Sequence, residues 1–186
     1  MRLTAIIISI FGIICQARAA ELLEIETSLS ANTGHGTFAP YFITSNNFGV
    51  TTERNSLNLR AGIFRRPDTT RRFDISYGLD LIGCASSTAA YDRYSPSDGE
   101  WYRYKAPHKW GWIQQLYATL RYRSIFITAG WQEVGSGLLD DKLSSGDLTW
   151  SANARPMPGI RLGFNRFVDI PFTAGALQIQ GELFYG

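Results

Sequence analysis

Seven short stretches of this chain alternate apolar with polar residues, and this period of two constrains the fold more than any other feature. In one of them, Leu79 and Leu81 flank Asp80. Since successive side chains of a β-strand point to opposite faces, each stretch predicts a strand with one apolar and one polar face. The predicted strands are residues 23–30, 56–64, 73–84, 112–122, 124–130, 158–164 and 177–185.

The connections between these strands are alternately long and short. The long ones are residues 31–55, 85–111 and 131–157, and the shorter ones are 65–72, the region of Arg123, and 165–176. Outer-membrane barrels have long extracellular loops and short periplasmic turns, whereas a soluble sandwich has no reason to follow this rule. The pattern therefore favours an antiparallel transmembrane β-barrel, with an apolar surface against lipid and a polar lumen.

The N-terminus predicts a secretory signal peptide over residues 1–19. Arg2 supplies a positive charge, residues 3–14 form an apolar segment, and residues 17–19 place small residues at the cleavage motif. We expect cleavage after Ala19 and location in the bacterial outer membrane. The mature chain would then hold one cysteine, Cys84, which we expect to be a small buried or lipid-facing hydrophobe.

The number of predicted strands bears on the size of the barrel. Single-chain bacterial barrels have even numbers of strands, and seven is odd. We therefore expect residues 20–186 to be the N-terminal portion of a larger barrel. A small structural barrel of about eight strands is an alternative, but it requires an eighth strand that the pattern does not provide.

The residues that support catalysis or metal binding are sparse. The net charge is +2 without a basic run, which argues against nucleic acid. His35 and His108 have no metal-ligand spacing, and no phosphate loop or nucleophile motif occurs. Asp140, Asp141 and Asp147 lack the ligand rhythm of a calcium loop, so we interpret them as a solvated loop. We expect no enzyme activity, no metal and no cofactor.

The connection at residues 85–111 is rich in aromatic rings. A sugar site combines flat aromatic surfaces with planar donors and acceptors, and Trp101 and Tyr102 lie among charged residues. They are therefore candidates for saccharide contact. The alternative is that these rings belong to the aromatic girdle of a barrel, as we expect for Trp110 and Trp112 near a strand start.

Charged residues of both signs fall on the polar face of the predicted strands. They are Glu24, Glu26, Arg60, Asp74, Asp80, Arg121, Arg161 and Glu182. Two arrangements are open at this point: ion pairs that block a lumen, or a lining for a path that conducts a charged polymer.

One distinctive segment runs from Ser144 to Pro158, with the core Asn153-Ala154-Arg155-Pro156-Met157-Pro158. Further distinctive segments are Ala39–Phe42, Gln114–Ala118, Leu120–Arg123, Leu177–Gly181 and Tyr185–Gly186. Together they resemble the capsule assembly Wzi family of outer-membrane proteins, in the form found in Bacteroidetes, and we call the segment from Ser144 to Pro158 the signature. Ala152 departs from the glycine usual in the family, and family members are much longer than this chain.

The resemblance implies a barrel of roughly 16–18 strands that acts as a surface lectin without catalysis. Its implied ligand is capsular polysaccharide, which it helps to assemble and anchor at the cell surface. Outer-membrane lipid would surround it, and the capsule export machinery is a further candidate partner. The alternative from another functional class is a porin or a polysaccharide-conducting channel.

Within the signature, Pro156 and Pro158 stiffen a segment that cannot pair as a central strand. Asn153 and Arg155 could then be held toward the lumen or the pore mouth. The planar guanidinium of Arg155 suits the carboxylates of uronic acids in an acidic capsule. The alternative is that both residues brace the loop by hydrogen bonds to the barrel backbone.

Overall fold

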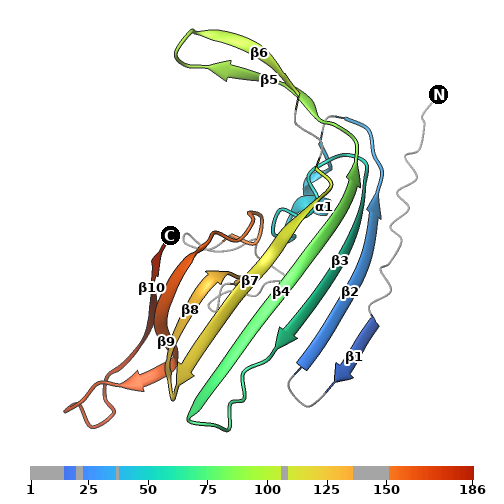
Figure 1. Ribbon diagram of the computed structural model, residues 1–186. Coiled ribbons are helices and arrows are strands. Elements are labelled where there is room, and N and C mark those ends of the chain that lie inside the picture. The colour runs from blue at the N-terminus through green and yellow to red at the C-terminus, as the bar shows by residue number, and fades with distance from the viewer. Residues whose placement is uncertain (1–14, 20–22, 37, 106–108, 136–150) are drawn as a thin grey trace.

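The computed structural model describes residues 15–19, 23–36, 38–105, 109–135 and 151–186, and most of them form one antiparallel β-sheet (Figure 1). In order across the sheet, its strands are β1 (Cys15–Ala19), β2 (Leu23–Asn32), β3 (Ser56–Arg65), β4 (Phe73–Ser86), β7 (Gly111–Tyr122), β8 (Ile125–Trp131), β9 (Gly159–Asp169) and β10 (Gln178–Tyr185). Sheet order follows chain order except for a separate hairpin between β4 and β7. The sheet is therefore an up-and-down meander.

Each of the seven predicted strands is present, with boundaries that differ by a few residues, and β1 is an eighth strand in the sheet. The largest difference is at β9, which was predicted to end at residue 164 but continues to Asp169. Its last residues pair with the start of β10, where Val168 lies opposite Ile179. Residues 165–167 lie in a β-bulge between this pair and the pair of Phe164 with Gly181.

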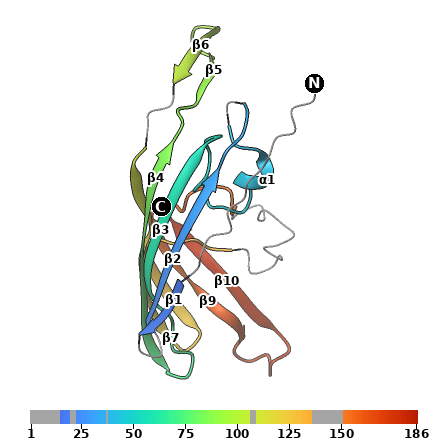
Figure 2. The same cartoon turned by 90° about the vertical axis from the view of Figure 1, so that its right-hand side faces the viewer.

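The connection at residues 85–111 was predicted to be a loop, and this was wrong. It contains a hairpin of β5 (Ala90–Ser95) and β6 (Glu100–Lys105), which extends beyond the end of the sheet in Figures 1 and 2. Cross-strand ring pairs hold the hairpin together, with the Tyr91 and Tyr104 ring centroids 5.3 Å apart. Gly99, with φ of +70°, allows the tight reversal between the two strands.

Strand β1 lies within the predicted signal peptide. It pairs with the start of β2, from Cys15 opposite Thr27 to Ala19 opposite Leu23. Residues 1–14 and 20–22, which include the residue after the predicted cleavage point, lie outside the described residues. Removal of β1 by cleavage after Ala19 would leave this edge of β2 without its partner.

The two faces of the sheet have the reverse of the usual burial. Along β4 the polar residues Asp74, Ser76 and Asp80 are buried, whereas the apolar residues on the other face are exposed. Asp80 is 0% exposed, and its neighbour Leu79 is 39% exposed. The strands therefore have the two faces that the period of two predicted. The polar face is the one that other parts of the chain cover.

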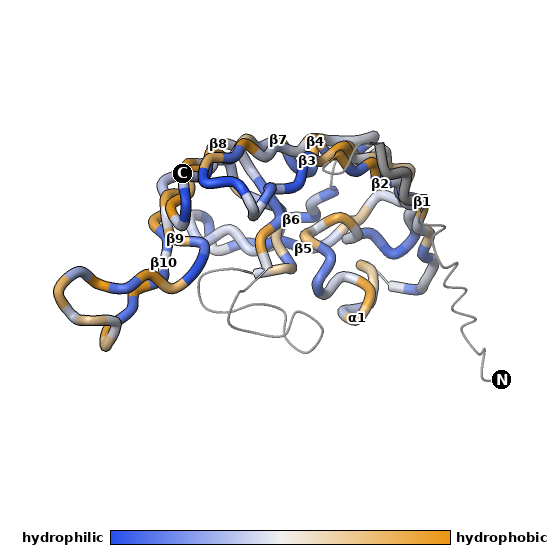
Figure 3. Tube along the Cα trace, turned by 90° about the horizontal axis from the view of Figure 1, so that it is seen from below, coloured by the Kyte–Doolittle hydropathy of each residue, from blue (hydrophilic) through white to orange (hydrophobic). Residues whose placement is uncertain are grey.

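The sheet is curved (Figure 3). Its polar face is the one that residues 48–51 cover, since Asn58 hydrogen bonds to Thr51 and Gln114 to the Phe48 carbonyl. The short helix α1 (Tyr41–Thr44) lies on the concave side of the sheet (Figures 2 and 3). Glu133, just after β8, hydrogen bonds to Gln114 and Gln115 of the polar face. No helix in the described part of the chain is long and apolar enough to span a membrane.

The two outer strands do not pair with each other. Among the described residues, β1 pairs with β2 alone and β10 pairs with β9 alone. All eight residues of β10 are exposed. The described sheet is therefore open, with one edge at β1 and the other at β10.

Candidate functional site

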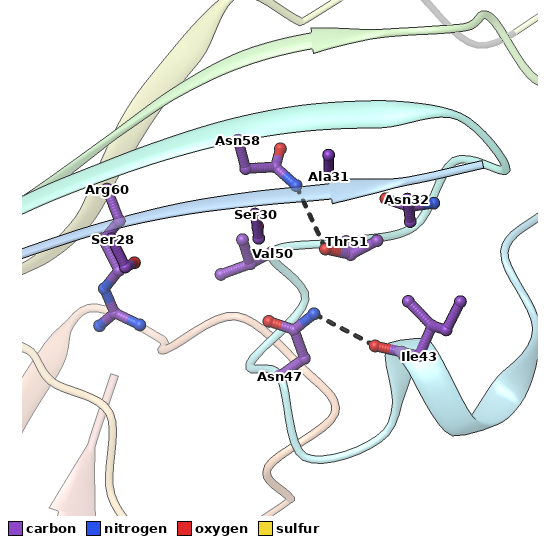
Figure 4. Close-up of a pocket in the computed structure, with 10 residues that line it drawn as sticks. All are labelled: Ser28, Ser30, Ala31, Asn32, Ile43, Asn47, Val50, Thr51, Asn58 and Arg60. Carbon is purple, nitrogen blue, oxygen red and sulfur yellow. Dashed lines mark hydrogen bonds between the residues drawn. The ribbon is translucent and has the colours of Figure 1, made fainter. Parts of the chain in front are cut away.

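The concave polar face holds two adjoining grooves that share Ser28 and Arg60. The larger has a volume of about 540 Å³, and the smaller one about 320 Å³. Both volumes lie in the range of small-molecule sites. Figure 4 shows the smaller groove, where Asn58 and Asn47 project from opposite sides and hydrogen bond to Thr51 and to the Ile43 carbonyl.

Ion pairs form the floor of the larger groove. Arg60 Nε donates to Asp80 Oδ2 at 2.7 Å, and its Nη2 lies 2.6 Å from Glu133 Oε2. Gln115 Nε2 donates to the same two carboxylates, and the Glu133 backbone N–H donates to Gln115 Oε1 at 3.0 Å. Arg60 is therefore neutralised by two carboxylates. Of the two arrangements considered for the charged polar face, the described residues show the ion-paired one here.

A β-bulge in β7 brings two glutamines to this floor. Asp80 pairs with Gln115 and Leu81 with Ile113, so Gln114 is an extra residue in β7. Both glutamines consequently point to the concave face, and Gln114 is only 1% exposed. Simple alternation would have placed Gln114 and Gln115 on opposite faces.

Gln114 connects the strand to the covering loops. It accepts a hydrogen bond from Trp112 Nε1 at 2.7 Å, and its Nε2 donates to the Phe48 carbonyl at 3.0 Å and to Glu133 Oε1 at 2.8 Å. Because a buried amide left without partners costs about 1–3 kcal/mol, these bonds hold the Phe48 and Glu133 segments to the sheet.

The family-like signature docks against the first long connection. The Asn46 N–H donates to Asn153 Oδ1 at 2.9 Å, and the Phe48 N–H donates to the Ala152 carbonyl. We name this contact between residues 45–50 and 152–155 the loop lock. One of the two expectations was that Asn153 braces the loop through hydrogen bonds to the barrel backbone. Asn153 does brace a loop, but its partner is the backbone of another loop and not of a strand.

Arg155 lies at the loop lock with its guanidinium over the ring of Trp112, 3.9 Å from the ring centroid. Burial holds the pKa of Arg155 below its ordinary value, and the negative charge of Glu53 opposes this shift. Among the described residues Arg155 forms no ion pair. Its stacking on Trp112 is a cation–π contact, which is energetically stronger where water is excluded.

The signature prolines keep their segment out of the sheet. Ala154, Pro156 and Pro158 lie in irregular chain that leads directly into β9 at Gly159. This agrees with the expectation that two prolines prevent pairing as a central strand.

Trp101 and Tyr102 lie on β6, away from the loop lock. They are 69% and 49% exposed. Trp101 packs against Tyr94 with ring centroids 5.4 Å apart, and the Tyr102 hydroxyl donates to Asp98 at 3.3 Å. The hairpin that carries them extends past the end of the sheet (Figure 1). The four predicted contact residues thus occupy two separate places, the β5–β6 hairpin and the loop lock.

The larger groove also contains two rings that sequence reasoning did not select, Phe64 and Tyr117. A Cβ atom built on Gly78 would lie 2.7 Å from Phe64 Cδ1 and 2.6 Å from Tyr117 Cε1, so both rings cover this glycine. Strand register is the signal that could have identified these rings, because Gly78 lies directly between Phe64 and Tyr117 across β3, β4 and β7. Rings beside paired charges give the groove the composition that a saccharide site requires.

Other expectations fall outside the described residues. They concern Asp140, Asp141, Asp147, His108 and the first part of the signature, residues 144–150. Within the part of the chain that the structure describes, no three histidine, cysteine, aspartate or glutamate side chains gather as a metal site would require. Cys84 is buried, which is one of the two environments that we expected for it.

We predict that Gly49→Ala weakens the loop lock. Gly49 has a φ of +68°, and an added Cβ would lie 3.1 Å from Arg155 Cγ. A left-handed backbone costs a residue with a side chain about 1–2 kcal/mol, and we expect the free energy of unfolding to fall by that amount. Urea unfolding of the refolded protein measures it. Gly181→Ala is the control, since its Cβ would meet nothing within 4 Å; equal losses in both variants would contradict the role of Gly49.

Comparisons with known proteins add no relative. No protein-family model matches the sequence, and neither the curated proteins nor the solved structures contain a significant match.

Proposed function

We propose that this protein is part of an outer-membrane β-barrel that binds capsular polysaccharide and helps to assemble it on the cell surface, without catalysis. Further strands would pair with the open edges of the described sheet. The observation that carries the proposal is the inverted burial of the sheet, with Asp80 and Gln114 buried on one face and apolar side chains exposed on the other.

The inverted burial supports a lipid environment. In a soluble antiparallel sheet the apolar face packs on a core and the polar face meets water. Here the exposed apolar face extends across the meander, including Leu59 on β3, Leu79 on β4, Leu120 on β7 and Leu162 on β9. An apolar surface of this extent is expected to meet lipid or another protein. Strand lengths also suit a bilayer, since about 9–11 tilted residues cross it and β3 has 10.

Three features support a saccharide as the ligand. The larger groove combines the rings of Phe64 and Tyr117 with paired charges. The β5–β6 hairpin presents Trp101 and Tyr102 to its surroundings. The segments that resemble the Wzi family include Asn153 and Arg155 at the loop lock. Hydroxyl-rich polymers bind through such combinations of ring faces and planar hydrogen-bonding groups.

Deletion of the gene tests the proposal against a transport role, which the polar groove favours as a second candidate. Loss of a capsule anchor should release polysaccharide into the medium while the cells still synthesise it. Retained capsule together with altered uptake of small solutes would instead support a porin or a polysaccharide channel.

We predict that Trp101→Ala combined with Tyr102→Ala weakens polysaccharide binding. Each exposed ring contributes on the order of 1 kcal/mol, so the double variant should bind roughly tenfold or more weakly. A pull-down on immobilised capsular polysaccharide measures this, with membrane insertion expected to be unchanged. The control is Phe167→Ala combined with Phe172→Ala, which removes two exposed rings beside the connection from β9 to β10. Equal binding by the Trp101/Tyr102 variant and the parent would exclude these rings as the contact.

A further inference from the structure

The end of the sheet with the short turns carries a continuous row of outward-facing apolar side chains. Phe73 on β4 pairs with Tyr122 on β7, Tyr122 with Ile125 on β8, and Ile125 with Phe164 on β9. Phe73, Tyr122 and Ile125 are exposed. The row therefore marks the last level of the apolar face before the turns begin.

Three arginines lie just beyond this row, within one or two residues of its members. Arg72 precedes Phe73, Arg123 follows Tyr122, and Arg166 lies two residues after Phe164; all three are exposed. Two hydrogen bonds join their turns: the Arg123 N–H donates to the Arg72 carbonyl at 2.6 Å, and Arg166 Nε donates to Ser124 Oγ at 2.7 Å. The arginines are consequently neighbours along one edge, and we name them the arginine edge.

The remaining arginines near this edge already have partners. Arg65 forms an ion pair with Asp74 at 3.1 Å, and Arg71 forms one with Asp68 at 2.9 Å. Arg121 is buried and donates to backbone carbonyls of the turns, including that of Arg123 at 3.1 Å.

The arginine edge differs, because none of its members forms an ion pair within the described residues. Arg123 Cζ lies 5.6 Å from the ring centroid of Tyr122, and Arg166 donates a hydrogen bond to the neutral Ser124 hydroxyl. Asp169 near the end of β9 accepts a hydrogen bond from Gln178 at 2.7 Å. Three guanidinium groups are therefore available to an external anion.

We propose that Arg72, Arg123 and Arg166 bind the phosphate groups of anionic phospholipids and anchor this end of the sheet at the membrane surface. The inference rests on the proposed membrane location. Aromatic side chains flank the apolar band of a barrel at the headgroup level, and the phosphates lie just beyond it. A guanidinium group binds phosphate through parallel hydrogen bonds. The aromatic row followed by the arginine edge reproduces this order.

Vesicle flotation of the refolded chain tests the proposal. The variant Arg72→Gln/Arg123→Gln/Arg166→Gln is compared with the parent on vesicles of phosphatidylglycerol and of phosphatidylcholine. A basic residue near an anionic surface contributes about 1 kcal/mol, so we expect the variant to partition on the order of a hundredfold less into phosphatidylglycerol. Its partition into phosphatidylcholine should fall much less, because choline neutralises the charge of each phosphate. Far-UV circular dichroism verifies equal strand content.

The matched control removes three exposed cations elsewhere, through Arg93→Gln, Lys105→Gln and Lys109→Gln. An equal loss in this control, or no loss in the arginine variant, would overturn the proposal. Inorganic phosphate that binds the parent without vesicles, as tightly as the lipid does, would assign the arginines to the free anion. If neither the parent nor its variants bind phosphatidylcholine, this result counts against the membrane-spanning proposal alone. The comparison on phosphatidylglycerol still tests the arginine edge.

Discussion

Asp80→Ala is expected to lower the free energy of unfolding by about 3–5 kcal/mol, the usual cost of removing one partner from a buried ion pair. Asp80 is 0% exposed and accepts hydrogen bonds from Arg60 Nε at 2.7 Å and from Gln115 Nε2 at 3.3 Å. Its removal would leave the half-buried Arg60 with Glu133 as its one carboxylate partner among the described residues. The groove floor should lose its order as a result.

Denaturant unfolding in detergent micelles measures this effect, followed by tryptophan fluorescence. The control is Asp92→Ala, because Asp92 pairs with Arg103 on the exposed hairpin and exposed pairs contribute only about 0–1 kcal/mol. Asp80→Asn keeps an acceptor but removes the charge, so we expect an intermediate loss. If Asp80→Ala cost no more than Asp92→Ala, the ion-paired floor would not be a stabilising element.

Leu79→Arg is expected to hinder insertion into vesicles by about 2–4 kcal/mol, the cost of a charged side chain near the bilayer midplane on the lipid face of a barrel. Leu79 is exposed and pairs with Leu116, which in turn pairs with Trp131, far from the row of Phe73 and Tyr122. Tyr122→Arg at that row is the matched control, with an expected cost of only about 0–1 kcal/mol.

Refolding into vesicles over a range of urea concentrations compares the two arginine variants. The depth dependence is the informative result, because a sheet whose apolar face met water would tolerate both substitutions equally. Improved solubility of Leu79→Arg in water, with unchanged strand content, would likewise count against a lipid-facing surface.

The period of two was sufficient to predict the strands of the main sheet from β2 onward. It succeeded because each of these strands has one apolar and one polar face, and a shift of one residue would exchange them. It failed on the β5–β6 hairpin, where Tyr91, Tyr94, Trp101, Tyr102 and Tyr104 give both faces rings. Because both faces of the hairpin carry rings, apolar and polar residues do not alternate along it, although β5 and β6 still pair.

The candidate site was only partly predictable. Arg60 and Asp80 were expected on the polar face, and register across β3 and β4 follows from the turn between them. The sequence pattern did not predict Glu133 as a site residue, because Glu133 lies after the end of β8. It reaches the site through its contacts with Arg60 and Gln115. The groove floor thus combines side chains placed by alternation with one placed by loop folding.

By itself, the sequence determined the strands of the main sheet from β2 onward, their two faces and the residue types available on each, since these depend on local backbone geometry. Only the tertiary structure decided which polar residues meet. The bulge that turns both Gln114 and Gln115 inward is a property of the paired β4 and β7. The loop lock joins Asn46 to Asn153 across 107 positions of chain, and such a contact depends on how the curved sheet positions the two loops, which no local pattern encodes.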